Sequence, residues 1–360
     1  MPARPRARSL LAVGAALVLI AVLAAVPSFS VNIPGVFGDT VDSPGTLQLL
    51  ALCLVFGGLA LTYDLLFGFT GLLSFGHALY FALGVYVPDV AMTQWHWGFL
   101  PALGLTAVVG LILPAILGTI SLRVGGIPFA MVTLAFAQAG AIFVSMDLGG
   151  LTGGEEGLNL DATRLPDLFV GVVNTKNLYW LALGFLVVAY AVSWWATQSP
   201  PGRVWQAIRE NERRVEVIGL RPYTFKLLVF VLSSFLAALG GVVYLLLLGG
   251  ATPEVTSANF TLVLLVMVVL GGAGTLWGAV LGGILYHYLD YRLVSFSSSS
   301  SIQGLPDVLR VPLSQPLFIL GTLFVILVMF FPGGIAGLIS RAAGRGYARA
   351  VIRLPARRGA

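Results

Sequence analysis

The sequence predicts an all-α protein that crosses a membrane about ten times, and three observations carry this prediction. Of its 360 residues, 58% are hydrophobic and only 10% are charged, whereas soluble domains carry about 25% charged residues. The mean hydropathy is +0.95. The apolar residues gather in long runs, and about 20 of them suffice for one helix to span a bilayer. We therefore expect a polytopic integral membrane protein, with one transmembrane domain over residues 1–340 and a basic cytoplasmic tail over 341–360.

Nine apolar runs are long enough to be considered as membrane spans. They cover residues 10–26, 47–67, 72–87, 99–121, 127–145, 178–196, 225–249, 260–289 and 317–331. The first run has two readings, a signal peptide or a short retained span, and we favour the retained helix. The single cysteine, Cys53, lies in an apolar run and permits no intramolecular disulfide.

Positive charge is clustered, and the clusters determine the topology. The net charge is +5, and the basic residues gather near the N-terminus, in the loop 198–224 and in the tail. Basic loops stay on the cytoplasmic side of a membrane. Nucleic-acid binding instead requires a basic surface on a water-facing domain, so we expect a lipid bilayer around this chain and no nucleic acid.

The topology requires the run 260–289 to cross the membrane twice. If the loop 198–224 and the tail are both cytoplasmic, an even number of crossings must separate them, yet only three uninterrupted runs lie between them. The run 260–289 contains a glycine-rich break at 271–274, and glycines weaken a helix. Splitting the run there gives ten crossings, places 16 of the 20 Lys and Arg residues inside, and leaves both termini cytoplasmic. The four basic residues left outside are Arg164, Lys176, Arg292 and Arg310.

A second glycine-rich break lies at 68–71, between the runs 47–67 and 72–87. Non-helical backbone inside a membrane persists only where it is buried in protein or lines a cavity. The two breaks are compatible with an internal repeat, and equally with two tight turns between helices.

The loop 198–224 predicts a short amphipathic helix. Pro200 ends the preceding span, and Gly219 and Pro222 end the helical pattern. One face of the helix would carry the apolar residues Trp205, Ile208, Val215 and Ile218. Such a helix can rest at the lipid interface or dock into a groove on a cytoplasmic partner, and the residues alone favour the interface.

Six segments, in one order along the chain, resemble the permeases of the branched-chain amino-acid ABC importer family. They lie at 71–77 (GLLSFGH), 129–136 (FAMVTLAF), 151–158 (LTGGEEGL), 209–212 (RENE, followed by Gly219), 269–278 (VLGGAGTLWG) and 331–338 (FPGGIAGL). Any one of these segments alone would be weak evidence, but six in order are specific.

The resemblance implies an ABC importer permease architecture in a bacterial inner membrane. It implies that the loop 198–224 couples the chain to an ATPase subunit. The residues that would carry this coupling are Trp205, Ile208, Arg209, Glu210, Glu212, Val215 and Gly219. It further implies a second homologous permease subunit, two cytoplasmic ATP-binding subunits and an extracytoplasmic solute-binding protein as partners.

Motifs for catalysis are missing from the sequence. There is no G-x-x-x-x-G-K-[ST] phosphate loop and no H-E-x-x-H or G-x-S-x-G sequence. ATP would therefore be hydrolysed by another chain, and we expect no enzyme activity, no cofactor and no metal site in this one.

Tyr63, Asp64 and His77 are candidates for the translocation path. A charged group at membrane depth usually faces a polar cavity or a partner. Asp64, however, lies near the predicted cytoplasmic interface, where an exposed carboxylate costs little, so a gate and a structural role at a helix end are both open. His77 is either a satisfied buried histidine, bonded across helices, or a contact for substrate or protons.

Other polar residues are assigned to the membrane surfaces. His96 and His287 each lie between aromatic residues and are expected in an interfacial aromatic belt. The glycines of 151–158 suit a turn with positive φ. Beside them, Glu155 and Glu156 either meet a solute-binding protein or belong to a solvated loop.

The sequence therefore indicates the permease subunit of an ATP-driven importer, with branched-chain amino acids as the expected solute. Urea or short amides are the alternative within this class. A secondary transporter without an ATPase is the alternative from another class, but it requires coupling-ion residues at mid-membrane, and away from helix ends only His77 qualifies. A membrane enzyme would need a catalytic cluster that the sequence lacks.

Overall fold

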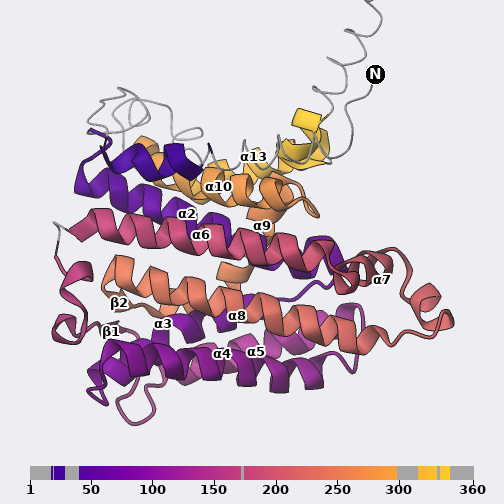
Figure 1. Cartoon of the computed structure of the whole chain (residues 1–360), viewed down its shortest axis with the longest axis horizontal. Coiled ribbons are helices and arrows are strands. Elements are labelled where there is room, and N and C mark those ends of the chain that lie inside the picture. The colour runs from indigo at the N-terminus through magenta and orange to yellow at the C-terminus, as the bar shows by residue number, and fades with distance from the viewer. Residues whose placement is uncertain are drawn as a thin grey trace, which may run out of the picture.

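The computed structural model describes residues 18, 20–28, 40–171, 174–297, 315–330 and 333–340. Within these residues the chain is a bundle of long helices that run roughly side by side (Figure 1). They are α2 (Pro44–Asp64), α3 (His77–Thr93), α4 (Phe99–Ser121), α5 (Ile127–Ser145), α6 (Thr175–Gln198), α8 (Pro222–Leu248), α9 (Ala258–Gly271), α10 (Leu276–Ser297) and α13 (Pro316–Phe330). These helices match the predicted crossings from the second to the tenth, and the all-α polytopic fold is confirmed. Most of the run 10–26 and the whole tail 341–360 lie outside the described residues.

Short elements connect the long helices. They are the 3₁₀ helices η1 (Val26–Ser28), η3 (Ala162–Arg164), η4 (Asp167–Phe169) and η6 (Pro253–Thr256), the π-helical turn η2 (Leu65–Phe69), the helix α7 (Pro200–Val217) and the strands β1 (Leu158–Asn159) and β2 (Gly250–Ala251). The two strands pair antiparallel, with Leu158 opposite Ala251. They join the loop after α5 to the loop after α8.

Helix α2 forms the centre of the bundle. It packs against α6, α8, α9 and α10. Of its most apolar 18-residue stretch, 89% is buried inside the protein. The corresponding stretches of α4 and α5 are only 22% and 28% buried. A helix that is apolar all round can be buried on every side, so α2 is the core, while α4 and α5 form an edge that other molecules can cover.

Five helical spans, of 19 to 27 residues, are long and apolar enough to cross a membrane by themselves. Helices α3 and α9 have 17 and 14 residues, which gives lengths of about 26 and 21 Å against a hydrocarbon core of about 30 Å. Backbone outside the α-helices must complete these two crossings. It precedes α3 at residues 71–76, and before α9 it is the segment 250–257, which holds β2 and η6.

The predicted split of the run 260–289 is confirmed as two antiparallel helices. Phe56 of α2 contacts Phe260 at the start of α9, with ring centroids 5.9 Å apart, and stacks on His287 midway along α10. Gly274, just after α9, lies against Gly68 at the end of the α2–η2 span. Helix α9 therefore runs parallel to α2, and α10 returns beside both. Gly282 lets the backbones of α10 and α9 approach each other so closely that a methyl group there would overlap the Met267 carbonyl.

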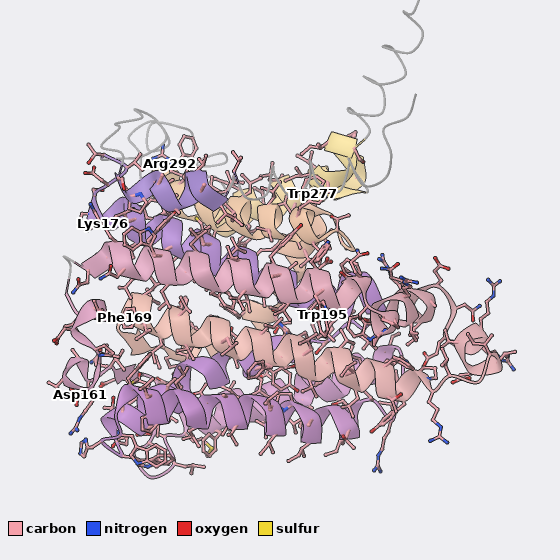
Figure 2. All side chains as sticks on the ribbon, viewed as in Figure 1. Asp161, Phe169, Lys176, Trp195, Trp277 and Arg292 are labelled. Atoms are coloured by element: carbon pink, nitrogen blue, oxygen red, sulfur yellow. The ribbon has the colours of Figure 1, made fainter. Side chains whose placement is uncertain are left out.

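The two ends of the bundle carry different elements. Helix α7 lies at the right-hand end in Figure 1, and β1 and β2 lie toward the left. In Figure 2 the labelled Lys176 and Arg292 lie toward the left, and Trp195 and Trp277 lie nearer α7. The topology counted from charge placed Lys176 and Arg292 on the side opposite the loop 198–224, and their positions in the structure agree.

One predicted span begins later than expected. The run 72–87 was expected to be helical from Leu72, but α3 begins at His77. Gly71 has φ +76°, which leaves the helical region. The following backbone finds partners other than a helix. The Phe75 N–H donates to the Thr133 hydroxyl at 3.1 Å. We call residues 71–76 the unwound segment.

The two surface histidines have different outcomes. His96 lies in an exposed loop between Trp95 and Trp97, whose ring centroids are 5.7 Å apart, as predicted. His287 was expected at the membrane surface, but its ring stacks on Phe56 at 4.4 Å between centroids. The prediction for His287 is wrong because α10 packs along the buried helix α2 and turns this side chain inward.

The split of α9 and α10 predicts which side each loop occupies. Single cysteines at Ser297, Glu216 and Ser340, on a Cys53→Ala background, should react with a membrane-impermeant maleimide. Ser297→Cys should react from the outside, and Glu216→Cys and Ser340→Cys only from the inside, because α10 and α13 each cross once. Reaction of Ser297→Cys and Glu216→Cys from the same side would contradict the topology.

Candidate functional site

Helix α7 occupies the loop 198–224, where the sequence predicts an amphipathic helix. The Ser199 hydroxyl caps its first turn, which satisfies one of the free N–H groups at a helix start. Trp205 is 1% exposed and donates its indole N–H to the Phe225 carbonyl at 2.9 Å. The first half of α7 is therefore anchored to the start of α8.

The apolar face of α7 is turned into the protein. Trp205, Ile208 and Val215 are buried, and α7 contacts α6, α8 and η2. The sequence left this face open between lipid and a partner, and it did not predict that the chain's own helices cover it. Ile218, expected on the same face, is 72% exposed because it follows the end of α7, so that assignment is wrong.

A kink divides α7 into two halves. Asn211 has φ −163° and ψ 101°, which is extended backbone inside the helix. Just beyond it, Glu212 forms an ion pair with Lys226 of α8, whose side chain is 10% exposed. Val217 is 82% exposed, and Gly219, with φ +88°, turns the chain away. The second half of α7 thus presents an exposed surface at the end of the bundle.

The two glycine-rich breaks meet in space, although they are far apart in sequence. The Gly274 N–H donates to Oδ1 of Asp64 at 2.8 Å. Gly68 lies so close that a methyl group there would overlap the backbone nitrogen of Gly274. Asp64 is fully buried. The expectation of an exposed carboxylate at the interface is wrong, because the second break covers it.

Arg209 reaches from α7 into this junction. It donates through Nη1 to the Gly68 carbonyl. Its side chain passes Gly71, where a methyl group would come within 3.2 Å of Cγ. A methyl group on Gly274 would come within 2.6 Å of Nη1. We call Asp64, Gly68, Gly71, Gly274 and Arg209 the glycine junction.

The residues proposed for the translocation path surround the unwound segment. Tyr63 and His77 are fully buried. The Tyr63 hydroxyl donates to the Ser74 carbonyl at 3.0 Å, and the Thr62 hydroxyl lies 2.9 Å from Nε2 of His77. Nδ1 of His77 has no hydrogen-bond partner in the described part of the chain. Tyr63 thus holds the unwound segment in place, and the cross-helix contact expected for His77 is present on one ring nitrogen.

The loop after α5 is built on one carboxylate. Asp147 accepts hydrogen bonds from the N–H groups of Thr152 and Gly153 at 2.8 and 3.0 Å. The Thr152 N–H, first among these donors, holds the pKa of Asp147 below its usual range. Gly153, Gly154 and Gly157 all have positive φ, as predicted. Glu155 and Glu156 are exposed at the tip of the turn.

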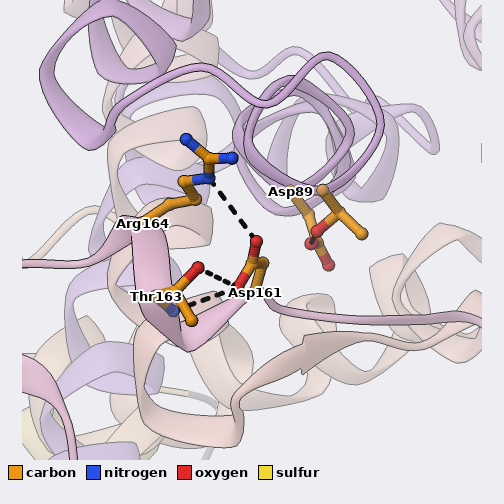
Figure 3. A network of polar contacts seen from close by, with 5 residues as sticks. Asp89, Asp161, Thr163 and Arg164 are labelled. Carbon is orange, nitrogen blue, oxygen red and sulfur yellow. Dashed lines mark hydrogen bonds and ion pairs between the residues drawn. The ribbon is translucent and has the colours of Figure 1, made fainter.

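A second local network lies nearby (Figure 3). Asp161 accepts from the N–H and hydroxyl of Thr163 at 3.0 and 2.6 Å, and Arg164 lies 3.6 Å from its other oxygen. Asp89 of α3 is fully buried and accepts from the Thr93 hydroxyl at 2.9 Å. Among the described residues no group of three or more His, Cys, Asp or Glu could hold a metal ion.

The sequence of this chain matches a known protein family. A family model described as "Branched-chain amino acid transport system / permease component" matches residues 45–329. The chain belongs to this family. No solved structure matches it.

Several known transport proteins are similar in sequence to parts of this chain. LivM of Escherichia coli, a high-affinity branched-chain amino acid transport system permease protein, is 28% identical over 68% of this chain. The chain spans 62% of the length of that relative. The ribose import permease protein RbsC of Haemophilus influenzae is 28% identical over 34% of this chain and 40% of its own length. The autoinducer 2 import system permease protein LsrC of Klebsiella pneumoniae is 31% identical over 40% of this chain and 43% of its own length.

Some features of the candidate site were not predicted from the sequence. Arg209 and Glu210 are both exposed residues on the first half of α7, and spacing alone did not show that the end of the Arg209 side chain enters the junction. The ion pair of Glu212 with Lys226 was also missed. The one signal that could have found the junction was the glycine content of both breaks, since glycine is required where a side chain passes close to backbone.

The glycine junction predicts a specific sensitivity to methyl groups. Gly274→Ala should destabilise the permease by about 1–3 kcal/mol, because position 274 has φ +84° and the methyl group would meet Arg209. The thermal unfolding temperature of the purified protein should fall by several degrees. Gly184→Ala in α6 is the control, since no atom lies within 4 Å of the added methyl group, and it should unfold at the same temperature or higher. Equal effects of the two changes would rule out a tight junction.

Proposed function

We propose that this chain is the transmembrane permease subunit of an ATP-driven importer for branched-chain amino acids in a bacterial inner membrane. The observation that carries the proposal is the family match over residues 45–329, together with a kinked helix that projects one half from the bundle and inserts Arg209 between two membrane segments. The chain would form one transmembrane domain with the coupling loop 198–224. It would need no cofactor and no catalytic activity of its own.

The ATPase subunits would bind the exposed second half of α7. The apolar face of α7 is already covered by α6 and α8, which leaves Val217 and Ile218, 82% and 72% exposed, as the apolar contacts available to a partner. Buried Trp205, Ile208 and Val215 would then transmit force to the bundle from inside. Because the ATPase subunits are cytoplasmic, docking on α7 would make this end of the bundle and both termini cytoplasmic. The β1–β2 end would then be extracytoplasmic.

The second permease subunit would cover α5. Gln138 is exposed on this helix, well inside the 19-residue span. A polar side chain at membrane depth is expected to face a protein partner or a water-filled cavity, because hydrocarbon offers it no hydrogen bonds. Ala135, one turn before Gln138, and Ala139, the next residue, are exposed too and allow close approach of another helix.

The solute path would pass beside the unwound segment. A cavity of about 340 Å³ lies between Gly71, Phe75 and the start of α5 at Ile127 and Met131. Tyr63, Asp64 and His77 are fully buried and are not among the residues that line this cavity. They would act on the path as supports of the gate, because Tyr63 bonds the unwound segment that borders the cavity. A solute-binding protein would meet the opposite end at Glu155 and Glu156.

The proposed solute can be tested by comparing its uptake with that of the solutes for which the relatives are named. In vesicles that contain the chain with its cognate ATPase and binding proteins, ATP-dependent uptake of leucine, isoleucine and valine should exceed that of ribose, autoinducer 2 and urea. Preferential ribose or autoinducer 2 uptake would move the chain toward the relatives RbsC and LsrC, and uptake without ATP would favour a secondary transporter.

The second half of α7 predicts where ATPase binding fails. Val217→Asp should reduce ATPase-subunit binding and uptake at least tenfold, because it places a charge in the apolar contact, while the inserted fold is retained. Co-purification and uptake measure the two effects. The control is Gln206→Asp, which adds the same charge at an exposed position on the first half of α7 and should leave binding intact. Normal ATPase binding by Val217→Asp would place the docking surface elsewhere.

The loop of Asp147 predicts a separate effect at the other end. Asp147→Ala should weaken binding-protein-dependent uptake several-fold, because the turn that carries Glu155 and Glu156 loses the acceptor of three hydrogen bonds. Asp161→Ala removes a comparable local acceptor and should have little effect.

The same loop has a predictable pH dependence. The folded pKa of Asp147 lies below the usual value of 3.8, so the stabilisation is complete above that value and is lost as the pH falls through the folded pKa. Binding-protein affinity of the native chain should therefore show no loss attributable to this group between pH 5 and 8. Protease cleavage of the loop in Asp147→Ala, but not in Asp161→Ala, would report the same loss of order.

A further inference from the structure

We propose that Arg209 is a latch that transmits movement of α7 to both helix breaks at once. The inference rests on the proposed function and adds a residue-level mechanism to it. Arg209 would be a positioning residue: it touches no solute, and it acts through the backbone of Gly68 and Gly274. Its guanidinium group stands where the end of the α2–η2 span and the break between α9 and α10 come together.

The first argument is the shape of the slot. Three glycines border the Arg209 side chain, and a methyl group on any of them would fill space that Arg209, Asp64 or the facing backbone occupies. Two of these glycines, Gly71 and Gly274, have φ of +76° and +84°. Glycine is needed here for both its conformation and its size. The slot accepts one long side chain and holds the two breaks against it.

The second argument is electrostatic. The last carbonyl groups of a helix lack partners and carry partial negative charge, which a cation stabilises. Arg209 supplies such a cation to the Gly68 carbonyl. At the facing break, Asp64 places a carboxylate on the Gly274 N–H, just before α10 begins at Leu276, and a helix start favours an anion. Each break is thus capped by a charge of the sign it requires.

The third argument is that the two caps act on each other. Oδ2 of Asp64 has no hydrogen-bond partner in the described part of the chain, and both residues meet at Gly68. Arg209 donates to the Gly68 carbonyl, and a methyl group on Gly68 would overlap Oδ1 of Asp64. If Arg209 withdraws, Gly68 is released, and Asp64 loses the packing that positions it on the Gly274 N–H. Moving Arg209 therefore weakens the hold of Asp64 on Gly274 as well.

The fourth argument is that the structure leaves room for the movement. A cavity of about 410 Å³ adjoins Arg209 and is bordered by Gly272, Thr275, Gly333, Ala336 and Ser340. The kink at Asn211 begins two residues after Arg209. A push on the exposed second half of α7 would therefore act next to Arg209, and the open space lets its side chain leave the junction.

The test compares variants of the intact complex in proteoliposomes. Arg209→Gln keeps much of the side chain and removes the charge. We expect it to retain ATPase-subunit binding and ATP hydrolysis but to lower uptake per ATP at least tenfold. Arg209→Lys keeps the charge without the planar fork. Its uptake per ATP should lie between those of the native complex and Arg209→Gln. Arg203→Gln changes an exposed arginine earlier in α7 and should match the native complex.

A structural readout separates the latch from a simple helix cap. Cysteines at Leu73, in the unwound segment, and at Ala273, in the other break, should change their rate of maleimide labelling when a non-hydrolysable ATP analogue is added. In the Arg209→Gln background both changes should vanish together. Asp64→Asn, which keeps an acceptor for the Gly274 N–H, should reduce both changes.

The outcomes are distinct. Unchanged uptake per ATP in Arg209→Gln, or loss of the labelling change at only one break, would overturn the latch. A parallel loss of unfolding temperature, ATPase binding and uptake would also overturn it, in favour of a purely structural cap. If the native complex itself binds no ATPase subunit and shows no ATP-dependent uptake, the proposed function fails, and the latch fails with it.

Discussion

The constraint that shapes this structure is that backbone N–H and C=O groups inside a membrane must find partners within the protein. Two crossings contain non-helical backbone, and lipid offers those groups no hydrogen bonds, so each unsatisfied group would cost several kcal/mol. The chain meets the constraint with side chains from other helices. Thr133 accepts from Phe75, Thr261 accepts from Ala78 at 3.0 Å, and Asp64 accepts from Gly274. These three buried polar residues therefore serve as partners for backbone at the helix breaks and helix starts.

That constraint also explains why α7, at the end of the bundle, is tied to the core. The end of the α2–η2 span exposes a carbonyl that no residue of the same helix can satisfy, and the side chain that satisfies it comes from α7. Glu212 and Lys226 fasten the same helix to α8. A helix held at both points cannot move without altering hydrogen bonds at membrane depth. Coupling between the end of the bundle and its interior is thus a consequence of how the breaks are capped.

The sequence predicted the parts of this arrangement that local patterns encode. Apolar length predicted the helices, charge predicted which loops share a side, and glycine clusters predicted both breaks. It did not predict that Gly68 and Gly274 would meet, because periodicity carries no information on which distant segments pair. It also mistook the environment of Asp64, since proximity to a helix end does not reveal what covers that end. The apolar face of α7 was recognised, but amphipathicity alone cannot say whether lipid, a partner or the chain's own helices will bury it.

The two ends of the bundle differ in the range of their contacts, and this difference bears on how they work. At the β1–β2 end, Asp147 and Asp161 bind groups within six residues of themselves, so those turns keep their shape whatever the helices do. At the α7 end, the contacts of Asp64 and Arg209 join segments separated by 210 and 141 residues. Local networks suit a surface that keeps one constant shape, as the proposed contact with a binding protein would require. Long-range contacts suit a region that must change, because displacing one partner displaces every segment it joins.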